Sequence, residues 1–470
     1  MAEADSNWSA DANACLELSL VEPSADGFNT IARFNPSFTY PIFGDDERIF
    51  GYQDLRISLR YHVADMRPHL KVKYGKKFRS VGATEPTDIE GLLREHLPAV
   101  AFSNNRDFED AIRQLPQDWV PPGEVVSEFD ANDGGTFEVR RGSLTDLAVK
   151  QILNRIQILV LFFIEGGSLI DTEDSDCDRW DIYFLFHRSN RDGASGAFKY
   201  RFAGYSTVYK FFPLQRYPLG AKAEPRQDLE LPAQEFPLSG LRSRSRISQF
   251  IILPNFQKTG SGSRLYRAIY ENCLRDPHVI EVTVEDPNEA FDDMRDVTDL
   301  LMLRRKPEFT ALKLNTEIRI PRQGAAPRGV VDEVKAEETR CLYRIAPRQF
   351  SRVLEMHLMS KLPDSVRPTL AEETDRPRPT KAETHEYDLW KLFVKQRLYR
   401  HNKELLSQLD RSERIDKLNE TLGSVELEYA RLVALADRRG PDMASTGKRK
   451  LEDDADGVSH PAKKTRVDDS

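Results

Sequence analysis

The chain has 470 residues, of which 39% are hydrophobic and 31% charged, and its formal net charge at pH 7 is −8. This length is enough for about three domains. The mild negative charge argues against nucleic-acid binding but is compatible with a basic peptide partner. The four cysteines form no CxxC pair, which argues against a zinc site or a disulfide scaffold, and without a long apolar run we expect neither secretion nor a membrane span.

The first 140 residues have the pattern of a small α+β domain. Apolar and polar residues alternate over 55–59 and again over 70–74, which predicts an antiparallel pair of strands. A helix is predicted over 88–97. Before these elements, an aromatic-rich stretch carries three consecutive acids in a turn, namely Asp45, Asp46 and Glu47.

The region from 141 to 310 is predicted to form the core domain. Leu144 to Ile164 has apolar residues around most of a helical circumference, which predicts one long, buried helix. Glu165 follows it, either as a solvent-facing helix end or as an acid near an active site. Two strands are then predicted, from Trp180 to Phe186 and from Phe198 to Phe211. Residues 213–246 are proline-rich and charged, which indicates an inserted loop: a surface excursion or a docking loop for a partner subunit.

The stretch from Ile247 to Asn288 is predicted to be a strand, a loop, a helix and a second strand. Phe250 to Leu253 is a short apolar run ended by proline, and the helix after the loop ends at Asp276-Pro277. Residues 280–284 alternate as in a strand and are followed by two acids, Glu285 and Asp286.

The loop of this unit favours a phosphate ligand. Gly260 and Gly262 allow the backbone to approach a bound group closely. The loop leads into the N-terminus of a helix, where free N–H groups and the helix dipole favour an anion. Neither a Walker P-loop nor a dinucleotide-binding fingerprint is present.

The C-terminal third is predicted to be helical and polar. We expect a helical domain over 311–362, a linker over 363–386, a charged helical pair or long helix over 387–438, and a disordered tail over 439–470. Two basic clusters in the tail, Lys448-Arg449-Lys450 and Lys463-Lys464-Thr465-Arg466, are typical of a bipartite nuclear import signal or of a charge-mixed solubilising tail.

The pattern Gln257-x-x-Gly260-x-Gly262 resembles the pyrophosphate loop of the GCN5-related N-acetyltransferases. The surrounding segments are similar to the catalytic subunits of type B histone acetyltransferases, of a fungal type with an extended C-terminus, and the resemblance covers roughly Trp8 to Leu362. They are Phe38 to Glu47, Phe50-Gly51-Tyr52, Ile247 to Phe250, Pro254 to Gln257 and Val284 to Asp293. The resemblance implies an α+β fold of the GCN5-related N-acetyltransferase type, with a mixed central sheet flanked by helices, a small N-terminal α+β domain and a helical C-terminal extension.

The implied reaction is transfer of an acetyl group from acetyl-CoA to a histone lysine, without a metal. A free lysine has a pKa near ~10.4, so a general base is needed at neutral pH. Glu285 is the candidate, because the end of an apolar strand and the neighbouring Asp286 would both raise the pKa of its carboxyl group. Asp286 and Glu165 remain alternatives. A covalent route through Cys273 is disfavoured, because its helical spacing points it into the packing.

The resemblance also implies which residues bind the cofactor. The backbone of Phe250, Ile251 and Ile252 would pair with the pantetheine arm, and Asn288 would bind near the thioester. The pyrophosphate would lie on the loop, made up of Gln257, Lys258, Thr259, Gly260, Ser261, Gly262 and Ser263.

For the substrate, the resemblance implies the tail of newly synthesised histone H4, with its H3 partner, in an acidic and aromatic groove. The residues concerned are Asp45, Asp46, Glu47, Trp180, Tyr209, Lys210 and Phe211. A WD-repeat histone-binding subunit and a location in both cytoplasm and nucleus are implied as well, with no membrane or direct nucleic-acid contact. Two alternatives stay open: an acetyltransferase for another basic substrate, and a non-catalytic histone escort that keeps the cofactor fold.

Overall fold

The computed structural model describes residues 8–24, 27–116, 118–189, 198–213, 241–321, 326–370 and 377–453, with the side chains of 440–453 left out. It divides into two compact units, Met1–Pro287 and Asn288–Ser470. The sequence placed boundaries near 140 and 310 instead. The position near 140 falls inside the first unit, where residues of the N-terminal sheet and of the core sheet belong to one hydrophobic core.

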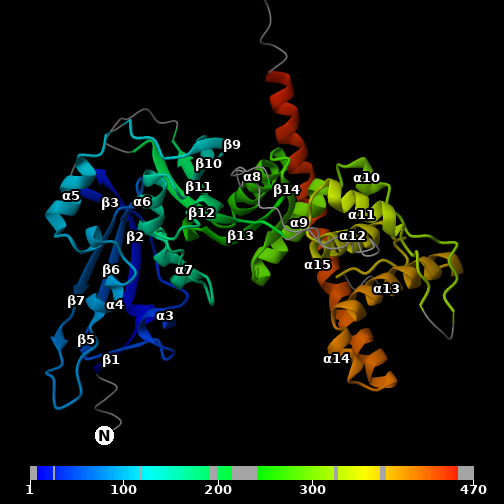
Figure 1. Ribbon diagram of the computed structural model, residues 1–470, viewed down its shortest axis with the longest axis horizontal. Helices are drawn as coiled ribbons and strands as arrows, with labels where there is room; N and C mark the ends of the chain where they lie inside the picture. Colours follow the sequence, from blue (N-terminus) through cyan, green and yellow to red (C-terminus); the bar gives the residue numbers. More distant parts are fainter. Residues whose placement is uncertain are drawn as a thin grey trace, which may run out of the picture. The chain divides into compact units, whose positions relative to one another are not determined.

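The N-terminal sheet has the strand order β3-β2-β6-β7 (Figure 1). Its strands are β2 (Leu16–Ser24), β3 (Gly27–Phe34), β6 (Arg56–His62) and β7 (Pro68–Lys73). β6 and β7 are antiparallel, so the predicted pair is confirmed. Short elements surround this sheet: β1 (Ser9–Asp11), α2 (Ala12–Cys15), α3 (Tyr40–Phe43), β4 (Arg48–Phe50), β5 (Tyr52–Gln53), β8 (Lys76–Lys77), α4 (Ile89–Arg94) and α5 (Asn105–Arg113).

The core sheet has six strands in the order β14-β13-β12-β11-β10-β9. They are β9 (Glu124–Asp130), β10 (Thr136–Ser143), β11 (Trp180–Arg188), β12 (Tyr200–Phe211), β13 (Ser243–Ile252) and β14 (Val279–Val284). Only the β13–β14 pair is parallel, and α8 (Ser261–Arg275) connects these two strands. The predicted mixed sheet and its strand–loop–helix–strand unit are therefore confirmed.

β13 begins earlier than the sequence predicted. The sequence assigned residues 243–246 to the proline-rich insert, but they are the first four residues of this strand. Ser243 and Ser245 are buried while Arg244 and Arg246 alternate with them outward. Because the inward residues are serines, the alternation carries no apolar signal. The rest of the insert, 214–240, lies outside the described residues.

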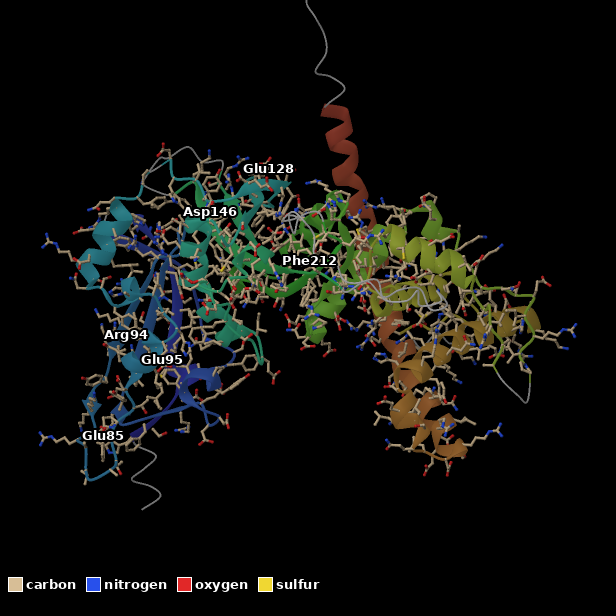
Figure 2. The ribbon with its side chains drawn as sticks, in the orientation of Figure 1. Glu85, Arg94, Glu95, Glu128, Asp146 and Phe212 are labelled. Carbon is tan, nitrogen blue, oxygen red and sulfur yellow. The ribbon has the colours of Figure 1, made fainter. Side chains whose placement is uncertain are left out.

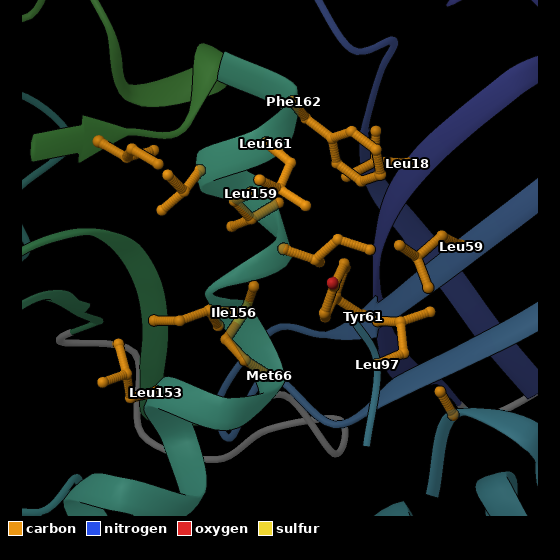
Figure 3. Close-up of a cluster of buried hydrophobic side chains, with 14 of the residues drawn as sticks. Leu18, Leu59, Tyr61, Met66, Leu97, Leu153, Ile156, Leu159, Leu161 and Phe162 are labelled. Carbon is orange, nitrogen blue, oxygen red and sulfur yellow. The ribbon is translucent and has the colours of Figure 1, made fainter. Parts of the chain in front are cut away.

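Two helices lie between the sheets, and the predicted single helix over 144–164 is wrong. α6 (Leu147–Ile156) and α7 (Ile158–Phe163) are separated at Gln157. Both segments are apolar, so periodicity alone does not reveal the break. Figure 3 shows their side chains packing against the N-terminal strands, where the labelled residues are Leu18, Leu59, Tyr61, Met66, Leu97, Leu153, Ile156, Leu159, Leu161 and Phe162.

A buried polar cluster joins α6 to the N-terminal sheet. His62 Nδ1 lies 2.6 Å from Asp65 Oδ1, and Arg155 Nη1 donates to Asp65 Oδ2 and to the Asp65 carbonyl, both at 2.8 Å. Burial alone would raise the pKa of Asp65, but the hydrogen bond from His62 and the charges of His62 and Arg155 outweigh it and lower the pKa to about 2. The ionised carboxylate therefore stabilises the fold.

Asp65→Asn should remove a pH-dependent part of this stability. A pKa lowered from 3.8 to about 2 corresponds to about 2.5 kcal/mol. Because the folded-state pKa is depressed, this contribution is fully present above pH 3.8 and is lost as the pH falls toward 2. Chemical unfolding of wild type and variant across acid pH should show a gap that narrows with acidification. A gap that stays constant over this range would contradict the assignment.

The second unit is helical. It contains α9 (Glu289–Leu303), α10 (Pro307–Thr310), α11 (Glu333–Leu342), α12 (Pro347–Lys361), α13 (Lys381–His401), α14 (Lys403–Ser407) and α15 (Arg411–Asp453). The predicted charged helical pair corresponds to α13 and α15. α15 continues to Asp453, whereas the sequence predicted disorder from 439. Extending an existing helix is far easier than starting one, so a polar segment can continue a packed helix.

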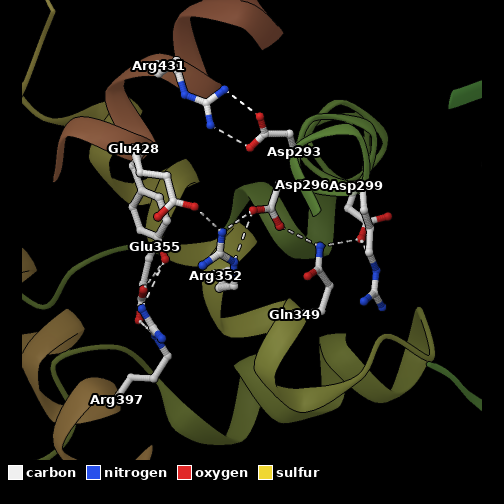
Figure 4. Close-up of polar contacts among 11 residues, drawn as sticks. Asp293, Asp296, Asp299, Gln349, Arg352, Glu355, Arg397, Glu428 and Arg431 are labelled. Carbon is white, nitrogen blue, oxygen red and sulfur yellow. Dashed lines mark hydrogen bonds and ion pairs between the residues drawn. The ribbon is translucent and has the colours of Figure 1, made fainter. Parts of the chain in front are cut away.

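Buried charges connect the helices of this unit (Figure 4). Arg352 Nη2 donates to Asp296 Oδ2 at 2.6 Å and to Glu428 Oε1 at 2.8 Å. Gln349 bridges Asp296 and Asp299 through its Nε2 atom. Asp296, Asp299 and Glu355 are all fully buried, so the network is an essential part of the packing rather than a surface feature.

Candidate active site

The loop before α8 has the local geometry of an anion site. Gln257 Nε2 donates back to the Ile252 carbonyl at 2.8 Å, and Thr259 Oγ1 donates to the Phe256 carbonyl at 2.8 Å, so side chains brace the loop. Gly260 is the N-cap of α8 with φ of 84°, and no side chain caps this 15-residue helix. Its first turn also carries no acid. The residues present therefore fit a phosphate group at this terminus.

The strands on either side of the loop separate where a cofactor arm is expected. β14 ends at Val284, whose register partner is Ile247, and the Glu285 amide donates to the Ile247 carbonyl at 2.9 Å. β13 continues for five more residues, Ser248–Ile252, beyond the end of β14. This stretch includes Phe250, Ile251 and Ile252, the residues predicted to pair with the pantetheine arm.

Glu285 lies at this point of separation, with two neighbours that the sequence did not reveal. Ser248 Oγ donates to Glu285 Oε2 at 2.6 Å, and Arg246 Nη1 lies 3.7 Å from Glu285 Oε1. The Glu285 side chain is 45% exposed. The predicted desolvation is therefore largely missing in this conformation: the carboxylate is half open to solvent and next to a guanidinium, because it extends past the end of the strand.

Three predicted substrate aromatics form a row on the same face of the sheet. The ring centroids of Trp180 and Tyr209 are 4.8 Å apart, and those of Tyr209 and Phe211 are 4.7 Å apart. The Arg246 guanidinium lies 4.1 Å from the centre of the Phe211 ring. Trp180, Tyr209 and Arg246 are cross-strand register partners, so they project on one face. Arg246 thus connects the aromatic row to Glu285.

Further contacts fix the far end of this row. The Tyr209 hydroxyl donates to Asp176 Oδ2 at 2.9 Å and accepts from Arg179 Nη1 at 3.2 Å. Phe212, labelled in Figure 2, follows β12, and the Arg179 guanidinium lies 5.6 Å from the centre of its ring. The row therefore consists of rings held by polar groups, which is the setting in which a lysine stem and its charge can be accommodated.

Lys210 does not belong to this row. It alternates with Tyr209 and Phe211 and so projects from the opposite face of the sheet. There, its Nζ lies 3.1 Å from Asp181 Oδ2, and Asp181 also accepts two hydrogen bonds from Arg141. Strand alternation therefore separates Lys210 from the aromatic residues, and its role in histone binding stays a prediction.

The acidic turn is only partly available to a ligand. Glu47 accepts from the amides of Thr39 and Tyr40 at 2.6 and 3.1 Å and from Asn13 Nδ2 at 2.7 Å, so its carboxylate holds the start of α3. Asp45 and Asp46 are exposed. The Tyr40 hydroxyl accepts from the Gly166 amide at 2.8 Å, which ties this region to the turn that carries Glu165.

The alternative acids are exposed. Glu165 lies in the turn after α7, and the nearby Ser168 carbonyl accepts from Gln249 Nε2 of β13 at 2.8 Å. Asp286 has φ of 32°, in the left-handed region where residues other than glycine are uncommon. Asn288 caps α9, since its side chain accepts from the Phe291 amide at 2.9 Å. A cofactor hydrogen bond from Asn288 would therefore have to come from Nδ2.

Cys273 is unsuited to nucleophilic chemistry. It is buried on α8, and burial raises the pKa of its thiol to about 11. In the part of the chain that the structure describes, no group of three or more His, Cys, Asp or Glu residues is placed to hold a metal ion. Within the same residues, no helix has the length and apolar character needed to cross a membrane.

Two stretches of the chain match models of known protein families. Residues 8–165 match the family model for the N-terminus of the histone acetyl transferase HAT1, and residues 324–363 match the fungal HAT1 C-terminal model. A solved aminoglycoside acetyltransferase from an uncultured soil metagenomic sample is 14% identical and covers 41% of this chain and 97% of its own, with a TM-score of 0.20, which is too low to carry an argument.

Full-length relatives are much closer. Proteins named histone acetyltransferase type B catalytic subunit are 66% identical in Pyricularia oryzae and 49% identical in Gibberella zeae, in each case over 100% of both chains. In Aspergillus oryzae the identity is 37%, over 91% of this chain and 86% of the relative. The predicted α+β class, with its mixed sheet and helical C-terminal region, is confirmed, and the chain belongs to the family of type B histone acetyltransferase catalytic subunits.

Proposed function

We propose that this protein transfers an acetyl group from acetyl-CoA to lysines in the N-terminal tail of newly synthesised histone H4, by direct attack of the lysine. The main support is the convergence of Glu285 with the aromatic row of Trp180, Tyr209 and Phe211 on one face of the core sheet. The proposed base and the proposed wall for a lysine stem would thus lie together, beside the stretch of β13 that extends beyond β14.

The cofactor would be held by backbone rather than by charged side chains. The amides at the N-terminus of α8 and of the loop from Gln257 to Ser263 would bind its pyrophosphate, and Phe250, Ile251 and Ile252 would pair with its pantetheine arm. When bound, it supplies the activated thioester that the lysine amine attacks. These assignments follow the resemblance, and the uncapped helix supports them.

Glu285 would take the proton from the lysine ammonium, directly or through one water. Its two neighbours position it: Ser248 holds Oε2, and the Arg246 guanidinium lies next to Oε1. Arg246 also covers the Phe211 ring, so an incoming lysine would have to share or displace this guanidinium. The carboxylate would then exchange its contact with Arg246 for one with the substrate.

Transfer of label from acetyl-CoA to an H4 tail peptide tests the proposal. We expect acetylation of the lysine peptide and none of a peptide in which every lysine is replaced by arginine. Polyamines and peptides acetylatable only at the N-terminus serve as competitors. Preference for either competitor would support an acetyltransferase for another basic substrate, and tail binding without any turnover would support the histone escort.

Gly260→Ala should weaken acetyl-CoA binding. Alanine at φ of 84° costs about 1–2 kcal/mol through the clash of Cβ with its own backbone, although no neighbouring atom lies within 4 Å of the added Cβ. The loop would relax and turn its amides away from the phosphates. Calorimetric titration should show a roughly tenfold higher Kd. Gly329→Ala is a matched control, since it has φ of 76° and equal space but lies in a loop of the second unit.

Partners and location are proposed from the resemblance. A WD-repeat histone-binding subunit would present H4 with its H3 partner, and the protein would be found in both cytoplasm and nucleus. Of the two import-type clusters, Lys448 to Lys450 lie on α15, and Lys463 to Arg466 lie outside the described residues. Co-purification from a fungal relative and the location of a fluorescent fusion test these two points.

A further inference from the structure

The outer face of the N-terminal sheet contains a hollow of about 800 Å³, within the range of ligand sites. Its lining includes five cations on three strands, β3, β6 and β7, and two acids, in a chain whose net charge is −8. The cations are Arg33, Arg56, Arg60, Lys71 and Lys73, and the acids are Asp11 and Glu17. Because the chain as a whole has more acids than cations, its composition does not explain this local excess of cations.

The arrangement of these cations is unfavourable for the sheet itself. Arg56 of β6 and Lys73 of β7 are register partners. Two residues further along, and on the same face, Ser58 of β6 is the register partner of Lys71. Like charges placed directly opposite each other on one face of a sheet destabilise it. Arg56, Lys71 and Lys73 form no ion pair with any residue that the structure describes, so this repulsion is not offset within the described fold.

The other two cations are already engaged. Arg33 lies 3.9 Å from Glu17. Arg60 Nη2 lies 3.0 Å from His69 Nδ1, contacts Asn105, and its guanidinium covers the Phe108 ring at 5.0 Å. Burial, together with the charges of Arg60 and Lys71, lowers the pKa of His69 to about 4, so this side chain is neutral at pH 7 and adds no charge. The exposed residues Arg56, Lys71 and Lys73 therefore define the part that can bind a ligand.

The geometry points to an acidic peptide segment of a partner protein, bound along β6 and β7 by Arg56, Lys71 and Lys73. Single-stranded nucleic acid is disfavoured, because no aromatic residue lines the hollow to stack a base. The two acids of the lining and the net negative charge of the chain disfavour a long polyanion. A short segment with spaced carboxylates can pair with the cations of the lining, and its uncharged backbone groups can lie beside the two acids. This surface does not involve the acetyl-transfer site.

Fluorescence anisotropy with a labelled oligoglutamate peptide and the full chain tests this inference. We expect saturable binding that weakens with added salt, and about a tenfold loss of affinity for Arg56→Glu/Lys73→Glu. Lys313→Glu/Arg319→Glu makes the same charge change at two exposed sites of the helical unit and should bind as wild type does. Arg56→Gln/Lys73→Gln should show a smaller loss, which separates lost attraction from introduced repulsion.

Three results would overturn the inference: no binding by wild type, an equal loss in the matched control, or tighter binding of a short single-stranded DNA than of the peptide. Circular dichroism of the variants and unchanged acetyl transfer exclude unfolding as a cause. Because the readout is peptide binding, its failure leaves the proposed acetyltransferase reaction unaffected, and the reverse also holds.

Discussion

Glu285→Gln is expected to lower the rate of acetyl transfer by about two to four orders of magnitude, while acetyl-CoA binds as before. Glutamine keeps the size of the side chain and can still accept from Ser248, so the local packing is preserved. It cannot accept the lysine proton. The loss should therefore appear mainly in kcat, because most of the substrate contact is assigned to Trp180, Tyr209 and Phe211 rather than to residue 285.

The matched controls are Glu165→Gln and Asp286→Asn. Each removes one exposed carboxylate in the same way, and each should retain most of the activity. Single-turnover kinetics with labelled acetyl-CoA and calorimetric measurement of cofactor affinity separate chemistry from binding. If Glu285→Gln keeps its rate while one of the controls loses it, the base is that other residue.

Arg397→Met is expected to destabilise the helical unit by about 3–5 kcal/mol, the usual result of leaving a buried charge without its partner. Arg397 Nε donates to Glu355 Oε1 at 2.7 Å, and Tyr429 donates to Oε2 at 2.8 Å. Glu355 is fully buried. Burial already raises the pKa of its carboxyl group against the opposing effect of Arg397, so removing the guanidinium raises that pKa further.

The loss should depend on pH in a defined direction. A raised folded-state pKa means that the folded form holds its proton more tightly, so stability is greatest at low pH and falls as the pH rises through the folded pKa. Hydrogen exchange of α12 and α13 should therefore show a larger defect at pH 8 than at pH 5. Arg400→Met, an exposed arginine one turn further along α13, should have little effect. A defect independent of pH would indicate lost packing rather than an unpaired charge.

The sequence predicted the elements whose pattern is local and apolar. β14 alternates cleanly, α8 begins after a glycine and ends at Asp276-Pro277, and β6 and β7 alternate on either side of a turn. Glu285 could be placed at the end of β14 because a proline follows two acids there. The loop could be identified because only glycine adopts φ of 84° at Gly260 without strain.

What the sequence could not predict depends on contacts between distant strands. Ser248 and Arg246 were missed because nothing local marks them. They reach Glu285 only because β13 and β14 are parallel and in register at Ile247. Lys210 was grouped with its aromatic neighbours in sequence, whereas strand alternation puts it on the other face of the sheet. The three consecutive acids of the turn look equivalent in the sequence, which did not show that the Glu47 carboxylate accepts hydrogen bonds from the Thr39 and Tyr40 amides.

The central claim is that acetyl transfer takes place at Glu285, with the cofactor on β13 and the histone lysine against the aromatic row. A crystal structure with coenzyme A linked through its sulfur to a lysine of an H4 tail peptide tests this most directly. We predict that the lysine nitrogen lies within about 3.2 Å of the Glu285 carboxylate, or one water away, with the pyrophosphate at the N-terminus of α8. A lysine nitrogen at Glu165 or Asp286, or a cofactor bound away from β13, would contradict the account.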